Sequence, residues 1–131
     1  MAQTPDHLVI EQGSISVAFL VDPSGGSAAK DFLESGGVTS QDKARLAYLF
    51  KKMASQGVLK NIEHFRKLEG RKEVHEFKAN QARVFAFRDG NCWYLTNGVV
   101  KKKDKHQPAD IDRAERIWNE HRLRKQQRGK P

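Results

Sequence analysis

The chain is poor in the residues that build several common kinds of site. Its 131 residues include a single cysteine, Cys92, so no disulfide can form within the chain, and such sparse cysteine use fits a reducing compartment. One thiol cannot build a thiolate metal site, and the five histidines show no ligand-like spacing. We therefore expect no metal centre and interpret Cys92 as a small buried hydrophobic residue rather than a nucleophile.

Long apolar runs and a targeting segment are also lacking. Hydrophobic residues make up 37% of the chain, and its mean hydropathy is −0.75. No apolar run approaches the roughly 20 residues that a helix needs to cross a bilayer. The N-terminus has no basic cluster followed by an apolar segment, and no glycine-rich phosphate loop occurs anywhere. These absences predict one cytoplasmic domain, residues 1–131, without a membrane or cofactor.

Positive charge is what the chain has in excess. The formal net charge is +8. Residues 1–70 hold eight basic and eight acidic side chains, whereas residues 71–131 hold sixteen basic and eight acidic ones. Such asymmetry favours a polyanionic partner, which could be a nucleic acid, an anionic membrane or an acidic protein. The alternative is a solvated basic surface that only aids solubility.

The stretch from Val74 to Lys103 predicts a meander of three antiparallel strands. Asp89-Gly90 lies between two apolar runs and is a strong hairpin signal, because the turn needs a positive φ that Gly adopts without cost. Asn80-Gln81 is a weaker turn signal, since Asn tolerates the left-handed region. The rest of the chain is expected to pack around this meander.

Charged residues lie inside these predicted strands. Period-two alternation places Glu76 and Lys78 on one face of the first strand. In the second strand Arg83 shares a face with Phe85 and Phe87, while alanine and valine occupy the other face. This strand is therefore covered at least partly on both sides, and the pattern does not decide which face is the core. We expect the charged side to form a platform that is the working surface.

The first half of the chain predicts one strand and two helices. Alternation over Ser14–Val21 indicates a strand, and Ser27–Ser35 fits two helical turns. A capping box at Thr39 begins the second helix, which ends at Gly57. Residues 58–72 are expected to cross back to the sheet. The apolar stripe of the second helix, which we expect in the core, consists of Leu46, Leu49, Phe50 and Met53.

A third helix is expected near the C-terminus. Pro108 suits a first helical turn, where its missing N–H costs nothing. Residues 122–131 have no apolar stripe and are expected to form a flexible basic tail, so the predicted core spans about residues 14–121. The apolar stripe of this third helix consists of Ile111, Ala114, Ile117 and Trp118.

The basic residues of the meander suit phosphodiester chemistry. Lys78, Arg83 and Lys101–Lys103 come from adjacent strands, so they can converge on a scissile phosphate and neutralise charge that develops in the transition state. Glu76 in such a field would stay ionised and could act as general base toward a ribose hydroxyl. Two alternatives stay open. Glu76 forms an ion pair with Lys78 or Arg83, or the lysine run is a solvated strand end.

Several short motifs occur in order along the chain. They are Leu68-Glu69-Gly70, Val74–Lys78, Ala82–Phe87, Asp89-Gly90, Tyr94–Gly98, Val99–Lys102 and Pro108–Ala114. Taken together, they resemble the RelE/HigB-type toxins of bacterial and phage toxin–antitoxin modules. The resemblance covers about residues 14–121. It implies an α+β RelE-like fold, in which an antiparallel meander packs against two N-terminal helices and a C-terminal helix follows.

The resemblance also implies a function. It implies metal-independent cleavage of mRNA, with the ribosome as a further partner, and neutralisation by a small helix-turn-helix antitoxin. Carried over by position, Arg83 matches the family's strand arginine, and Lys78 and the pair Lys101-Lys102 match its basic positions. The candidate catalytic residues are Arg83, Lys101, Lys102, Glu76 and Lys78. The candidate RNA-binding residues are Lys103, Lys105, His106 and Arg88.

Departures from the family pattern leave the acid and the base unassigned. Ala82 stands where a tyrosine usually precedes the strand arginine, and Phe85 and Phe87 carry no hydroxyl. Because a fold does not fix a target, two other functions remain. One is a non-catalytic RNA- or ribosome-binding protein, and the other is a gyrase-directed toxin of the same superfamily.

Overall fold

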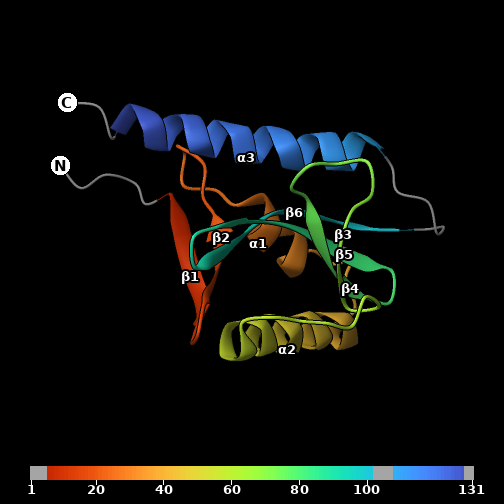
Figure 1. Cartoon of the computed structure of the whole chain (residues 1–131). Coiled ribbons are helices and arrows are strands. Elements are labelled where there is room, and N and C mark those ends of the chain that lie inside the picture. Colours follow the sequence, from red (N-terminus) through yellow and green to blue (C-terminus); the bar gives the residue numbers. More distant parts are fainter. Residues whose placement is uncertain (1–5, 102–107, 129–131) are drawn as a thin grey trace.

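The computed structural model describes residues 6–101 and 108–128 (Figure 1). It has the expected α+β class, with a six-stranded sheet in the order β1-β2-β6-β5-β4-β3. The strands are β1 (His7–Gln12), β2 (Ser16–Leu20), β3 (Phe65–Lys67), β4 (His75–Ala79), β5 (Ala82–Asp89) and β6 (Cys92–Val100). The helices are α1 (Ala28–Glu34), α2 (Ser40–Gln56) and α3 (Pro108–Arg128). None of the described helices is long and apolar enough to cross a membrane.

The predicted meander is confirmed as β4, β5 and β6. Both of its turns place a residue in the left-handed region, Asn80 with φ of 53° and Gly90 with φ of 61°. These are residue types that adopt this region with little strain, so the local sequence sets both turns. The resulting register pairs Glu76 with Phe85 and Lys78 with Arg83 across β4 and β5.

The sheet is larger than the predicted meander and mixed in direction. β2 pairs in parallel with β6, with Ser16 opposite Cys92, and β1 pairs antiparallel with β2. β3 pairs with β4 at the opposite edge. The sequence prediction did not identify either edge strand. β3 is only three residues long, and β1 exposes Leu8 and Val9, so neither shows a clear alternation of buried and exposed residues.

The helices cover both faces of the sheet, so their placement differs from the expected packing of the meander against two N-terminal helices. On one face α1 and α2 pack on Phe77 and Val84, and on the other α3 packs on Phe85 and Phe87 (Figure 1). Trp118 of α3 stacks on Phe87, with ring centroids 5.1 Å apart. Successive side chains of β5 thus enter opposite cores, which is why this strand is apolar on both sides.

α2 begins at its predicted cap, Thr39, and α1 begins after Ser27, the first residue of the segment predicted to be helical. The Ser27 hydroxyl accepts the backbone N–H of Lys30 at the start of α1, and the Thr39 hydroxyl accepts that of Asp42 at the start of α2. Gly57, in the left-handed region with φ of 79°, ends α2. The predicted stripe of α2 is buried, as expected for core residues.

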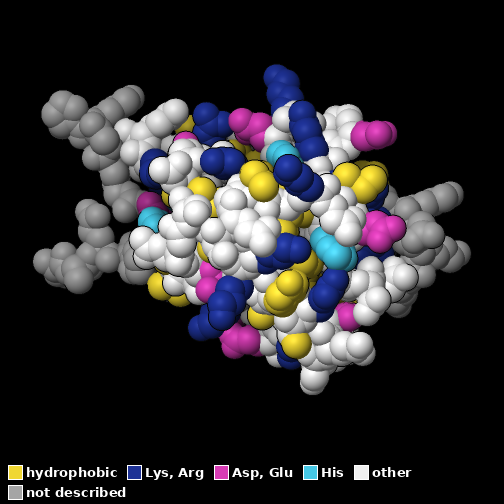
Figure 2. All heavy atoms as spheres, turned by 60° about the horizontal axis from the view of Figure 1, so that its bottom comes forward, with side chains coloured by type: hydrophobic (Ala, Val, Ile, Leu, Met, Phe, Trp, Pro, Cys, Tyr) yellow, Lys and Arg dark blue, Asp and Glu magenta, His cyan; other side chains and the backbone are white. Residues whose placement is uncertain are grey.

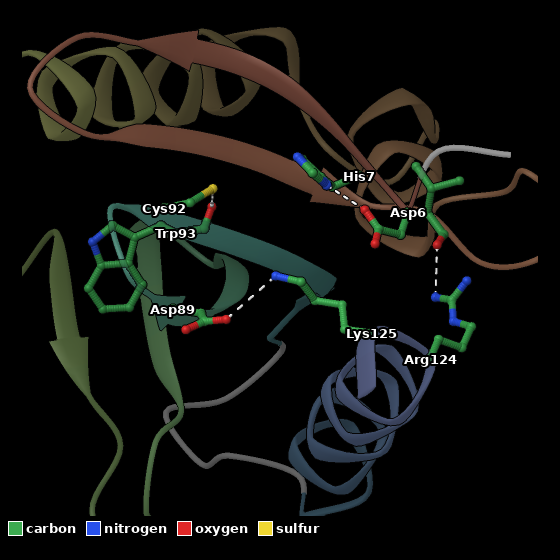
Figure 3. Close-up of polar contacts among 8 residues, drawn as sticks. Asp6, His7, Asp89, Cys92, Trp93, Arg124 and Lys125 are labelled. Atoms are coloured by element: carbon green, nitrogen blue, oxygen red, sulfur yellow. Dashed lines mark hydrogen bonds and ion pairs between the residues drawn. The ribbon is translucent and has the colours of Figure 1, made fainter. Parts of the chain in front are cut away.

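The expectation of a flexible tail is wrong for residues 122–128, which continue α3; residues 129–131 lie outside the described part. Polar contacts, rather than an apolar stripe, hold the end of α3 in place. The Arg124 guanidinium donates to the carbonyl of Val21 at 2.9 Å, and the Lys125 ammonium lies 3.7 Å from the Asp89 carboxylate. Figure 3 shows Lys125 reaching from α3 toward Asp89.

The side chain of His121 in α3 is fully buried. Its ring lies 5.2 Å from that of Tyr94 and 5.5 Å from that of Trp118. Neither ring nitrogen has a hydrogen-bond partner among the described residues. Burial is the main cause that lowers the pKa of His121 to about 4, although the Asp6 carboxylate opposes this shift. The folded protein therefore holds a neutral imidazole at this position.

The buried imidazole predicts a loss of stability in acid. An ordinary histidine has a pKa of 6.5, so between pH 6.5 and about 4 the unfolded chain binds a proton that the folded protein excludes. The free energy of unfolding should fall over this interval by roughly 2–3 kcal/mol on account of His121. Denaturant titrations at pH 7 and pH 4 measure this loss of stability in the wild type and in His121→Leu. Both proteins contain the same carboxylates, so the difference between them isolates the contribution of His121. Equal pH dependence in the two proteins would contradict the assignment.

Candidate functional site

One end of the sheet gathers four basic side chains around a single carboxylate. Glu76 of β4 has no exposed surface. One of its oxygens lies 2.9 Å from Arg66 Nε of β3, and the other lies 3.5 Å from Arg83 Nε of β5. Lys78 and Lys101 interact electrostatically with all three of these groups. We call these five residues the cationic cluster.

Strand pairing brings the cluster together from three strands and the residue that follows β6. Glu76 and Lys78 are two residues apart on β4 and share a face. Lys78 lies opposite Arg83 in the β4–β5 register. Beyond the end of β6, the backbone N–H of Lys101 donates to the carbonyl of Gln81 at 2.8 Å, which places Lys101 beside the turn that begins β5. The convergence expected for Lys78, Arg83 and Lys101 is therefore present in the fold.

Arg83 is held inside the cluster rather than displayed on an open platform. Its side chain is only 6% exposed. One terminal nitrogen donates to the carbonyl of Ala82 at 3.1 Å and to that of Asn80. The guanidinium therefore fixes the β4–β5 turn while its Nε faces Glu76. Arg83 shares this face of the sheet with Phe85 and Phe87, which belong to the core beneath α3. The face is therefore covered.

Four positively charged groups lie close together in the cluster, and their partial burial limits screening by water. Burial lowers the pKa of Lys78, and the neighbouring Arg66 and Arg83 lower it further. Burial likewise lowers the pKa of Lys101, whereas Glu76 acts in the opposite direction. Four basic groups against one carboxylate leave an excess of positive charge. A phosphate placed beside them would be stabilised by charge-assisted hydrogen bonds.

The other predicted site residues do not join this group. Arg88 lies toward the other end of β5, where its Nε donates to the carbonyl of Gly90 at 3.1 Å and its guanidinium stands 6.0 Å from the centre of the Trp93 ring. The remaining candidates, Lys102, Lys103, Lys105 and His106, lie outside the described residues.

Arg66 is the cluster member that sequence reasoning missed. Its strand, β3, was assigned only to the segment crossing back to the sheet. The available signal was slight, because β3 contains one buried apolar residue, Phe65, followed by Arg66 and Lys67. Only pairing with β4, which places Arg66 opposite Glu76, reveals the contact. The Arg66 side chain is 40% exposed, so it forms the solvent side of the cluster.

No metal-binding group is found among residues 6–101 and 108–128, where no three His, Cys, Asp or Glu side chains gather suitably. Cys92 is half-buried at the start of β6, and its Sγ points to the carbonyl of Trp93 at 3.6 Å (Figure 3). Burial raises the pKa of its thiol. A protonated thiol is a poor nucleophile, so nothing around Cys92 favours a catalytic role.

The central position of Glu76 predicts a large loss of stability when its charge is removed. Glu76→Gln would leave Arg83 and Lys101 buried beside Arg66 without a counter-ion, and breaking such a pair costs about 3–5 kcal/mol. Arg66→Gln is the matched control, and it should cost less because Arg66 is partly solvated. Denaturant unfolding of both variants measures the difference. Wild-type stability of Glu76→Gln would show that the cluster does not depend on this carboxylate.

Comparison with known protein families finds one family model that matches the chain. The family model described as "Phage derived protein Gp49-like (DUF891)" matches residues 37–119. No curated protein matches the chain significantly. The matched segment runs from the residues before α2 into α3 and contains every member of the cationic cluster. Because this segment is more than half of the chain, the chain belongs to the Gp49-like family of phage-derived proteins.

Proposed function

We propose that this Gp49-like protein is the toxin of a toxin–antitoxin pair and that it cleaves mRNA. The observation that carries the proposal is the cationic cluster, in which four basic side chains surround one buried carboxylate at the end of the sheet. Its excess positive charge suits a phosphodiester, and its partial burial strengthens each interaction. The resemblance of the meander motifs to RelE/HigB-type toxins points in the same direction.

The reaction proposed is attack of a ribose 2′-OH on the adjacent phosphate. A bond forms between the 2′ oxygen and phosphorus while the bond from phosphorus to the 5′ oxygen breaks. The products are a 2′,3′-cyclic phosphate and a 5′-OH end. Arg66 and Lys78, the more exposed cations, bind the phosphate, and Arg83 and Lys101 supply the positive field that stabilises its transition-state charge.

The proton transfers are assigned differently from the sequence-based hypothesis. Glu76 has no exposed surface and faces two arginines, so we assign it the role of positioning Arg66 and Arg83 rather than that of general base. Lys78 is partly exposed and has a lowered pKa. It still binds the phosphate as an ammonium ion, so we propose that water accepts the 2′-OH proton and that water also protonates the departing 5′ oxygen.

One observation favours a second candidate, a non-catalytic RNA-binding protein. The carboxylate that would be the natural base is enclosed by arginines, so the same cluster can bind phosphates without any bond being broken. Ribosome binding would use the same contacts. In either case the antitoxin is expected to be an acidic partner that covers the cluster, since RNA and antitoxin would compete for the same cations.

The two candidates differ in what happens to RNA when the protein is induced in a host cell. Cleavage predicts growth arrest together with new mRNA fragments that carry 5′-OH ends, detected by ligation-based end mapping. Lys78→Ala and Lys101→Ala should each reduce the new ends by about tenfold or more, because removal of one transition-state contact costs at least about 1.4 kcal/mol. Lys30→Ala, which removes an exposed lysine of α1, is the control and should behave as wild type.

Arrest of growth with unchanged transcript ends would exclude the nuclease and leave the binding protein. The purified protein provides a second discrimination. RNA binding through the cluster should weaken steeply with salt, and Lys78→Ala should reduce the slope of log K against log salt by about one or less.

A further inference from the structure

A polar pocket lies next to the cationic cluster, between α2, the residues before β3 and the end of β4. Its volume is about 650 Å³, within the roughly 300–1,000 Å³ that small-molecule sites occupy. Figure 2 shows the face to which α2 contributes, where Lys and Arg side chains stand in separate groups among hydrophobic ones. We call this hollow the α2 pocket. Its lining includes Asp42, Arg45, Tyr48, His64, Lys78 and Asn80.

An exposed aromatic ring forms one side of the α2 pocket. Tyr48 is 52% exposed and belongs to neither hydrophobic core, so the fold does not require it. The guanidinium of Arg45 stands over this ring at 5.7 Å from its centre. Arg45 is held in turn by His64, with 2.9 Å between its Nη2 and the imidazole Nε2. An aromatic ring and a guanidinium plane are the two surfaces on which unstacked RNA bases are held.

The lining of the α2 pocket also includes a polar wall of fixed groups. The amide nitrogen of Asn80 donates to the Asp42 carboxylate at 2.6 Å, which ties the β4–β5 turn to the first turn of α2. The N–H of Asp42 is itself bonded to the Thr39 hydroxyl. These amide and carboxylate groups offer donors and acceptors of the kind that read the edge of a base. They are held in place before any ligand binds.

Lys78 joins the α2 pocket to the cationic cluster. Its backbone N–H donates to the carbonyl of His64, which lines the pocket. Its ammonium interacts with Glu63 on the pocket side and with Glu76 and Arg83 on the cluster side. A nucleotide whose phosphate lies against Lys78 would therefore have its base within reach of the pocket.

We propose that the α2 pocket holds one unstacked base of single-stranded RNA against Tyr48 and Arg45 while the neighbouring phosphate lies on Lys78 and the cationic cluster. The inference rests on the proposed function, because it specifies how the same site holds its RNA. The lining favours a base over an acidic peptide, since Asp42 and Glu63 would repel carboxylates at the pocket. A base presents no charge and uses both the ring and the polar wall.

The test measures binding without cleavage. The probe is a fluorescein-labelled, mixed-sequence hexaribonucleotide carrying 2′-O-methyl groups, which removes the attacking hydroxyl, and affinity is read by fluorescence anisotropy. Loss of one base–aromatic stack corresponds to about a 5- to 150-fold weaker Kd, which is the expected result for Tyr48→Ala. Tyr48→Phe keeps the ring and should bind within about twofold of wild type. Circular dichroism checks that each variant is folded.

Two comparisons make the result specific. Ile62→Ala removes another exposed apolar side chain, 72% exposed and outside the α2 pocket, and should leave RNA affinity unchanged. In a second series, one nucleotide at a time is made abasic. At the position whose base enters the pocket, the abasic probe and Tyr48→Ala should not be additive, because each removes the same stack.

The outcomes distinguish failure of the α2 pocket proposal from failure of the proposed RNA function. If wild type binds the probe and Lys78→Ala weakens binding but Tyr48→Ala does not, the α2 pocket proposal is overturned while the RNA function stands. If Ile62→Ala weakens binding as much as Tyr48→Ala, the effect belongs to a broad apolar face of the kind that contacts proteins, and the proposal again fails. If wild type does not bind single-stranded RNA at all, both proposals fall.

Discussion

The constraint on which the structure depends is that β5 is buried on both faces. Val84 and Ala86 face the core beneath α1 and α2, whereas Phe85 and Phe87 face the core beneath α3. A strand in this position requires a strand on each side and helices above and below, because its backbone groups and both rows of side chains must leave water. α3 therefore has to return across the sheet, and its polar contacts with Val21, which follows β2, and with Asp89 of β5 hold it there.

The same constraint explains why the charged residues of the meander are paired rather than displayed. Arg83 shares its face with Phe85 and Phe87, so it lies partly in the interior and requires a counter-ion. Glu76 supplies that counter-ion from the adjacent strand, and Arg66 shares it from the edge. One carboxylate among four cations leaves the cluster short of negative charge. We propose that this structural ion pair also stabilises a phosphate and that the neighbouring α2 pocket receives the attached base.

Local signals predicted the elements whose causes are local. The turn at Asp89-Gly90, the cap at Thr39 and the alternation of β5 each depend on a few consecutive residues, and each was found as expected. The edge strands β1 and β3 were missed because they are short or exposed and are defined by their partners. The last turns of α3 were missed for a related reason, since they are held by polar contacts to Val21 and Asp89 rather than by an apolar stripe.

The sequence by itself determined the α+β class, the antiparallel meander and the excess of positive charge in the second half of the chain. It also determined which neighbours share a strand face with Glu76, Lys78 and Arg83. These features follow from turn chemistry, composition and the two-residue period of a strand. Only the tertiary structure decided that helices cover both faces, that Arg66 joins the cluster and that Arg88 does not. It also decided that Glu76 is enclosed by arginines, since burial and ion pairing depend on which strands meet. That meeting is set by packing across the whole domain, which no local stretch of sequence encodes.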